Sequence, residues 1–343
     1  MKYILEPLLF AFDQNTTEDE LVEYLAELIN LDDWWTNHKD EMYVLSNTGD
    51  VLCENGYYPL IESLKPLLDK YGIDFISYKD IGRMLDKYLN KSKYIDEVCN
   101  EQMIGLNDWK YEKPLTSDIS NRPKVLHEQF ENILWNVACM RMIKEEDAET
   151  YVTIAKGISE DIKVKFKYET IETVDGKEVL LEKEERAVIY CKSSLTDFLM
   201  NAKTPFLIWK FAESKDDLDL GVRISVYQAK NMTSLDEAYV NYNFVIQQSF
   251  YDDFENGHYK NRESDITSSL QALTDAVTDK NLRKMHAIRE GKSGASKDLV
   301  VNGYDAKRRD ITTSIKVAYW KKGKEFRIAN MKEHDLVGIS EEW

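Results

Sequence analysis

The stretches KVKFKY (163–168) and EVLLEKEERAVIYC (178–191) decide the fold class of this chain. In the first stretch, lysines alternate with apolar or aromatic residues, which is the period of a strand with one buried face. Asp175-Gly176, between the two stretches, is a typical hairpin turn. The sequence therefore predicts a β-hairpin in the middle of the chain.

The segments before this hairpin have helical patterns instead. TTEDELVEYLAELINL (16–31) places Thr17 as an N-cap and Glu20 three residues later, which predicts a capping box. PLIESLKPLLDKYG (59–72) and SYKDIGRMLDKYL (77–89) each carry leucines at the spacing of one helix face. The first hundred residues are therefore expected to be helical.

A composition change marks the expected domain boundary. Residues 105–123 hold two prolines and clustered turn formers, which favours a linker. We therefore predict an acidic helical domain at residues 1–115 and a mixed α+β domain at residues 116–343.

The second domain is expected to contain strands and at least two hairpins. PFLIWKF (205–211) and GVRISVYQAK (221–230) are short apolar or alternating segments that predict strands. SIKVAYW (314–320) and EFRIAN (325–330) flank a turn at Lys322-Gly323 and predict a second hairpin. Together these elements predict the α+β class.

Composition favours a cytoplasmic protein with packed cores. The chain has 343 residues, of which 43% are hydrophobic and 11% aromatic. Its four cysteines are far apart, which is typical of reduced thiols. No segment reaches the roughly 18 consecutive apolar residues of a membrane span, so no membrane contact is expected.

Charge is distributed unevenly along the sequence. The formal net charge is −17, yet residues 280–332 hold fifteen Lys or Arg and five acids, a local net charge of +10. This basic segment is expected either to pair with acidic surfaces of its own chain, of a second copy or of a protein partner, or to contact nucleic acid. The candidate contact residues are Arg283, Lys284, Arg289, Lys292, Lys307, Arg308, Arg309, Lys321, Lys322 and Lys324.

Gly291-Lys292-Ser293 has the ending of a nucleotide-binding P-loop. However, His286 stands where the first glycine of that motif belongs, and the preceding residues 281–290 have the pattern of a helix end. A P-loop needs a strand before it and a helix after it. No nucleotide is therefore expected at this stretch.

Gln228 and Lys230 suggest an enzymatic alternative. On a strand they would share one face, where an apolar core face ends. Together with Asp219 upstream and a QxxxY pair at Gln247 and Tyr251, this arrangement resembles metal-dependent nucleases of the PD-(D/E)XK class. That resemblance implies a Mg²⁺ ion held by Asp219, with Lys230 stabilising the attacking water or the phosphate charge and Gln228 in place of the usual acid.

Two further patterns have weaker chemical meaning. Arg122 and His127 have the R-x4-H spacing that resembles HEPN-type ribonucleases, although Pro123 places the arginine outside the expected helix. The cluster YDDFENGH (251–258) offers carboxylates that could hold a cation, but a helix end with solvated acids explains it better. The leading hypothesis is therefore an interaction protein, with a metal-dependent nuclease as the alternative.

Overall fold

The computed structural model describes residues 1–97, 105–113, 115, 122–143, 150–174, 177–281, 284–290, 296–333 and 339–342. The chain forms two compact units, Met1–Phe198 and Leu199–Trp343, which we call the first and second unit. The α+β class is confirmed, because the described strands form two mixed sheets accompanied by helices. Because β1 pairs with β5, hydrogen-bonded strands lie on both sides of the boundary expected near residue 115.

The described part of the first unit contains seven paired strands. They are β1 (Lys2–Leu5), β2 (Met42–Val44), β3 (Lys93–Tyr94), β4 (Gly105–Tyr111), β5 (Tyr151–Ile154), β6 (Ile162–Val174) and β7 (Lys177–Lys192). The described helices of this unit are η1 (Pro7–Leu9), α1 (Glu18–His38), η2 (Lys39–Glu41), α2 (Thr48–Glu54), α3 (Ile61–Tyr71), α4 (Tyr78–Lys91), α7 (Lys124–Ile143) and α8 (Leu195–Met200), the last of which extends past Phe198.

The order of these strands is β3-β2-β1-β5-β7-β6-β4. The strands from β3 to the end of β7 run parallel, whereas β6 and β4 are antiparallel to their neighbours. The expectation that the first hundred residues are only helical was wrong, since three of the parallel strands lie there. Each is only two to four residues long, which is too short for a visible period.

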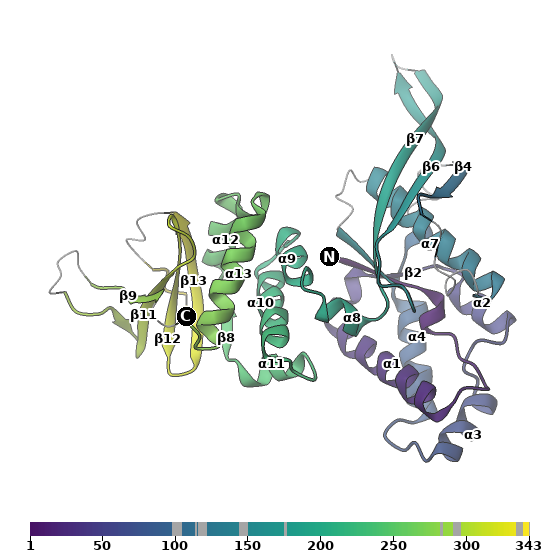
Figure 1. The fold of residues 1–343 in the computed structure, drawn as a ribbon, viewed down its shortest axis with the longest axis horizontal. Helices are drawn as coiled ribbons and strands as arrows, with labels where there is room; N and C mark the ends of the chain where they lie inside the picture. The colour runs from purple at the N-terminus through teal and green to yellow at the C-terminus, as the bar shows by residue number, and fades with distance from the viewer. Residues whose placement is uncertain are drawn as a thin grey trace. The chain divides into compact units, whose positions relative to one another are not determined.

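Helices cover both faces of this parallel sheet. Ile4 and Tyr43, paired side by side, pack with Phe130 and Ile133 of α7 on one face. On the other face, Tyr3 makes an edge-to-face contact with Trp34 of α1, at a ring centroid distance of 5.3 Å. The hairpin predicted from residues 163–191 is confirmed as β6–β7, and in Figure 1 it extends well beyond the other strands.

The second unit combines a helical layer with a six-stranded sheet of order β10-β11-β12-β13-β8, where β9 pairs with β11. Its helices are α9 (Thr204–Lys210), α10 (Lys215–Lys230), α11 (Asp236–Asn241), α12 (Gln248–Asn256), η4 (Tyr259–Asn261) and α13 (Glu263–Val277). Its strands are β8 (Phe244–Ile246), β9 (Met285–Ala287), β10 (Val300–Val301), β11 (Tyr304–Asp310), β12 (Ile315–Lys322) and β13 (Glu325–Glu333).

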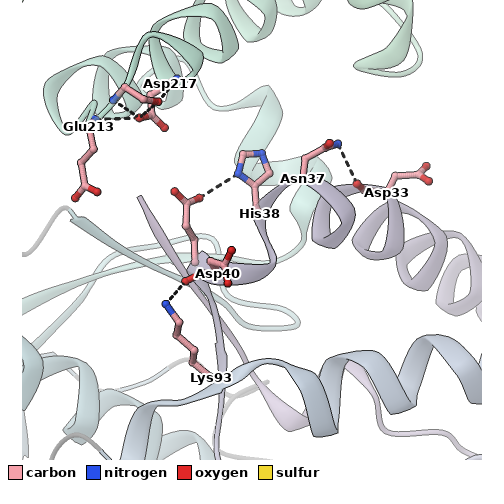
Figure 2. Close-up of polar contacts among 9 residues, drawn as sticks. Asp33, Asn37, His38, Asp40, Lys93, Glu213 and Asp217 are labelled. Atoms are coloured by element: carbon pink, nitrogen blue, oxygen red, sulfur yellow. Dashed lines mark hydrogen bonds and ion pairs between the residues drawn. The ribbon is translucent and has the colours of Figure 1, made fainter.

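Two predicted strands of this unit are helices, and those predictions were wrong. Residues 205–211 lie in α9 and its C-cap, and residues 221–230 form the second half of α10. The side chain of Ser214 caps α10 and forms a capping box with Asp217, whose contacts are drawn in Figure 2. The predicted hairpin of β12 and β13 is confirmed, with its turn at Gly323-Lys324, one residue later than expected.

Candidate functional site

The order of the parallel strands singles out one position in the first unit. From β1 the chain proceeds through β2 to β3 on one side, and then returns through α7 to β5 on the other side of β1. The loops that follow β1 and β5 therefore leave the sheet in opposite directions. In open α/β sheets, ligands bind at this switch point, outside the carboxyl ends of the strands.

A buried ion pair fixes the loops at this point. Glu6, the residue after β1, is fully buried and contacts the guanidinium of Arg122, which comes just before α7. Arg122 also donates to the main-chain carbonyl of Lys156, which lies in the turn after β5. One guanidinium thus joins the ends of both central strands to the start of the crossover helix.

Burial is the main influence on the charge of the Glu6–Arg122 pair. Loss of hydration raises the pKa of the Glu6 carboxyl to about 8, and the positive charge of Arg122 limits the rise. The guanidinium also lies over the ring of Phe130, 4.9 Å from its centroid. Both side chains are therefore bound by groups of the protein itself, and their role is to hold the ends of β1 and β5 in place.

A cavity of about 280 Å³, lined in part by Lys156, lies beside the Glu6–Arg122 pair. Its lining comes from the β1–α1 loop, the first two turns of α1 and the turn after β5: Ala11, Phe12, Asp13, Asn15, Thr16, Glu20, Leu21, Tyr24 and Lys156. Phe12, Leu21 and Tyr24 are buried and form its apolar wall. The phenol of Tyr24 donates to the carbonyl of Phe10 at 3.2 Å, which fixes the ring.

The polar groups of the cavity carry both signs of charge. Lys156 is exposed and makes no ion pair with any residue in the described ranges. Glu20 is ionised, because hydrogen bonds from the main chain and hydroxyl of Thr17 lower its pKa. The Asp13 carboxylate accepts from the main-chain N–H of Asn15 at 2.8 Å, which shapes the loop. Two carboxylates and one ammonium group thus line a single small cavity.

The same geometry argues against a dinucleotide. Phosphate binding at a first βα turn uses glycines in the loop and free N–H groups at the helix N-terminus. Here the first glycine of the chain is Gly49, far beyond the loop. The capping box of Thr17 and Glu20 occupies the start of α1, and Glu18 and Asp19 add negative charge there. A phosphate group would meet repulsion at this helix end.

The three residues of the nuclease hypothesis do not converge. Asp219 and Lys230 are eleven residues apart on α10, which is about 16 Å along a helix axis. Gln228 and Lys230, expected on one strand face, are about 200° apart around the helix. The strand that would have placed them together is absent at this position, because residues 215–230 are helical.

Each of these residues has a different environment. The Asp219 carboxylate accepts from Nε of Arg223 at 3.0 Å, and burial raises its pKa. Gln228 donates to the carbonyls of Leu199 and Asn201. Lys230 is exposed in the last turn of α10. An Mg²⁺ ion bound by Asp219 would compete with Arg223, and no group of three or more metal-binding side chains occurs within the described ranges.

Gln228 does reach a cavity, of about 370 Å³, between α9, α10 and α13. No charged side chain lines it; the lining residues are Ala202, Pro205, Phe206, Ser225, Gln228, Ala229, Thr267, Leu270, Gln271 and Thr274. The hydroxyl of Thr274 is buried there without a hydrogen-bond partner among the described atoms. The cavity therefore offers amide and hydroxyl groups and no charge.

The basic segment largely pairs with acids of its own unit. Arg309 is 1% exposed and its guanidinium contacts Asp275 of α13 at 3.1 Å. Lys321 contacts Asp279 at 2.8 Å, and weaker pairs join Lys307 to Asp305 and Arg289 to Asp298. By count, the second unit holds 22 basic and 22 acidic residues, so the net charge of −17 belongs to the first unit.

A smaller set of cations remains on the surface. Lys284, Lys322 and Lys324 are exposed, and Arg308 is half-buried on β11. Lys322 also lies over the ring of Tyr304, 5.3 Å from its centroid. Arg283 and Lys292, the other two candidates, lie outside the described residues. Arg309 is therefore unavailable to an external partner, whereas the β12–β13 turn presents two exposed ammonium groups.

Gly291, Lys292 and Ser293 also lie outside the described residues, but their flanks are described. β9 precedes them where a helix end was expected, so that expectation was wrong. An isolated bridge between Arg289 and Asp298 joins the two flanks, and β10 follows. The described residues after this stretch thus form a strand, where a P-loop requires a helix.

The remaining two patterns have structural roles. Arg122 is the buried partner of Glu6, while His127 lies on α7 with its Nε2 3.6 Å from Glu131. In the carboxylate cluster, Asp253 accepts from the side-chain amide of Asn330 at 2.9 Å. Asp253 thus ties α12 to β13, and Asp252 accepts from Gln248 on its own helix.

A comparison with protein-family models, with curated proteins and with solved structures found no match to this chain. In the described part of the chain, no helix is both long and apolar enough to cross a membrane. The assignment of a site at the switch point therefore depends only on the geometry of the residues there. Sequence reasoning missed it because Glu6 and Lys156 follow strands too short to detect.

Proposed function

We propose that the first unit binds a small zwitterion of the amino-acid class in the cavity at its switch point. The ligand's carboxylate would pair with Lys156, and its ammonium group with Asp13 and Glu20. The observation that carries this proposal is the position of the cavity, which opens where the strand order reverses. It combines two carboxylates with one ammonium group that has no ion-pair partner among the described residues.

The size and charge of the cavity support this ligand class. At about 280 Å³ it is slightly smaller than the cavities of roughly 300–1,000 Å³ that hold drug-sized ligands, which favours a compact molecule. A dianion would be repelled by the two carboxylates, and a simple cation would leave Lys156 without a counter-charge. The buried wall of Phe12, Leu21 and Tyr24 favours an aliphatic or aromatic side chain on the ligand.

Calorimetric titration of the full chain with a panel of amino acids, amines and dicarboxylates tests the proposal. We expect an amino acid to bind, and Lys156→Ala to weaken that binding about tenfold or more, which corresponds to 1.4 kcal/mol. Lys79→Ala, which removes another exposed lysine of the same unit, serves as the control. Failure of the whole amino-acid panel to bind, or equal affinity of Lys156→Ala, would overturn the proposal.

The exposed cations of residues 280–332 support a second proposal, in which the second unit contacts an acidic protein or nucleic acid. Lys322 and Lys324 lie on either side of Gly323 at the β12–β13 turn and have no acidic partner among the described residues. If the partner is nucleic acid, the double variant Lys322→Ala/Lys324→Ala should bind duplex DNA more weakly. The slope of log affinity against log salt concentration should also become shallower, by about 0.9 for each phosphate that the variant no longer neutralises. If the double variant instead loses binding to an acidic protein and keeps the DNA affinity of the wild type, the natural partner of these lysines is a protein.

A further inference from the structure

The cavity between α9, α10 and α13 is a second candidate ligand site, separate from the one in the first unit. These three helices pack against one another in the second unit (Figure 1). The cavity has a volume of about 370 Å³. Small-molecule sites usually measure roughly 300–1,000 Å³, so there is room for a ligand the size of a small sugar or a nucleoside.

The side chain of Gln228 supplies a hydrogen-bond acceptor to the lining. Its Nε2 donates to the carbonyl of Leu199 at 2.6 Å and to that of Asn201 at 2.9 Å, which uses both amide hydrogens. These two bonds also fix which end of the amide is the nitrogen. The oxygen Oε1 has no partner among the described residues, so it is left for a ligand.

Gln271 has a similar arrangement on α13. Its Nε2 donates to Oδ1 of Asp275 at 2.9 Å, and Asp275 is itself fixed by the buried guanidinium of Arg309. Three of the four amide hydrogens of Gln228 and Gln271 are therefore used within the protein. The two glutamines thus act on a ligand mainly through their oxygens.

Three hydroxyl groups complete the polar lining. Ser225 is half-buried, and its hydroxyl bonds to no other residue in the described ranges. Thr274 is 4% exposed, and its hydroxyl is likewise without a partner there. Thr267 donates to the carbonyl of Glu263 at 3.0 Å, so its oxygen is left as an acceptor. The donors that remain for a ligand are therefore mostly hydroxyl groups.

We propose that this cavity binds a neutral saccharide. Each sugar hydroxyl both donates and accepts, so it can donate to a glutamine oxygen and accept from Ser225 or Thr274. Pro205, Phe206 and Leu270 provide apolar surface for the C–H groups of the sugar ring. A charged ligand would lose hydration without gaining an opposite charge, because no charged side chain lines the cavity.

A nucleobase fits this lining less well. Glutamine recognises adenine by donating and accepting at the same base edge. Gln228 has no amide hydrogen left for that contact, since both donate to main-chain carbonyls. The phosphate groups of a nucleotide would also find no cation in the lining. The pattern of free acceptors and hydroxyls therefore favours the sugar.

Saturation-transfer NMR of the full chain tests the inference. The probes are glucose, galactose, mannose, N-acetylglucosamine and their disaccharides, with adenosine and cytidine for comparison. We expect transfer to at least one sugar and none to the nucleosides. Ser225→Ala removes a hydroxyl that has no partner in the described part of the protein, so the fold should be unchanged. Sugar binding should weaken by about three- to tenfold, the value of one hydrogen bond.

A blocking variant provides an independent readout. Ala229 is exposed on α10 and lines the cavity, so Ala229→Phe should fill the cavity, abolish sugar binding and leave the melting temperature unchanged. Ala26→Phe, at an exposed position of α1, is the matched control and should bind as the wild type does. Lys156→Ala should also bind sugar normally, which separates this inference from the proposal for the first unit. Absence of binding by the whole sugar panel, binding of the nucleosides instead, or sugar binding that survives Ala229→Phe would overturn the inference.

Discussion

The indole ring of Trp209 occupies the space where a β-carbon on residue 221 would stand. An ideal β-carbon at Gly221 would lie 2.3 Å from Cδ1 and 2.6 Å from Nε1 of Trp209. The ring is fully buried, and its Nε1 donates to the carbonyl of Leu218 at 2.9 Å. α9 and α10 therefore approach each other closely only because position 221 lacks a side chain.

Gly221→Ala should destabilise the second unit by about 2 kcal/mol, since the added methyl group displaces a buried ring. Urea denaturation followed by tryptophan fluorescence measures the change. Gly82→Ala in α4 is a matched control, because a β-carbon there has no neighbour within 4 Å. That control should gain about 0.5–1 kcal/mol from the better helix propensity of alanine. Equal effects of both changes would contradict this account.

Arg309→Ala should destabilise the protein by about 3–5 kcal/mol, because it leaves the buried carboxylate of Asp275 without its cation. The guanidinium also donates to the carbonyl of Lys280, which would lose that bond. Lys324→Ala, at an exposed position of the same basic segment, should change stability by less than about 0.5 kcal/mol. Thermal unfolding distinguishes the two, and a stable Arg309→Ala protein would show that the pair is dispensable.

Stability of the first unit should fall as the pH rises from about 4.5 to 8. Burial raises the pKa of Glu6 in the folded state to about 8, above its ordinary value of 4.5. In that window the folded state binds more protons than the unfolded state, so a rise in pH favours unfolding. Glu6→Gln removes this titration and should flatten the dependence, as urea midpoints at several pH values would reveal. An unchanged slope in Glu6→Gln would refute the assignment.

Asp219→Asn and Lys230→Ala should behave differently. Asp219 accepts from the buried Arg223, so its loss should lower stability by about 1–3 kcal/mol, whereas Lys230 is exposed. Incubation of both variants with DNA and Mg²⁺ provides the second readout. Parallel loss of a wild-type cleavage activity in two stably folded variants would restore the nuclease hypothesis.

Elements with strong local signals could be predicted from the sequence. The capping box at Thr17 and the β6–β7 and β12–β13 hairpins are confirmed, because their turn and cap residues act over a few positions. α10 was missed because it is buried on nearly all sides, so Val222, Ile224 and Val226 mimic the alternation of a strand. Its start was nevertheless encoded in Ser214 and Asp217.

The candidate site could not be predicted, since it depends on contacts that are distant in sequence. Glu6, Arg122 and Lys156 are more than thirty residues apart and meet only through the strand order. Even the charge pattern at 280–332 was informative only in part, because the sequence does not reveal that Asp275 neutralises Arg309.

The central position of β1 has a consequence for biosynthesis. β1 is made before the other strands of its sheet, yet one of its two neighbours, β5, is made about 150 residues later. Until then, Tyr3, Ile4 and Leu5 have an open edge on a nascent chain, and the sheet is completed only when the end of β7 has emerged. Chains truncated before residue 150 should therefore be prone to aggregation and to capture by chaperones.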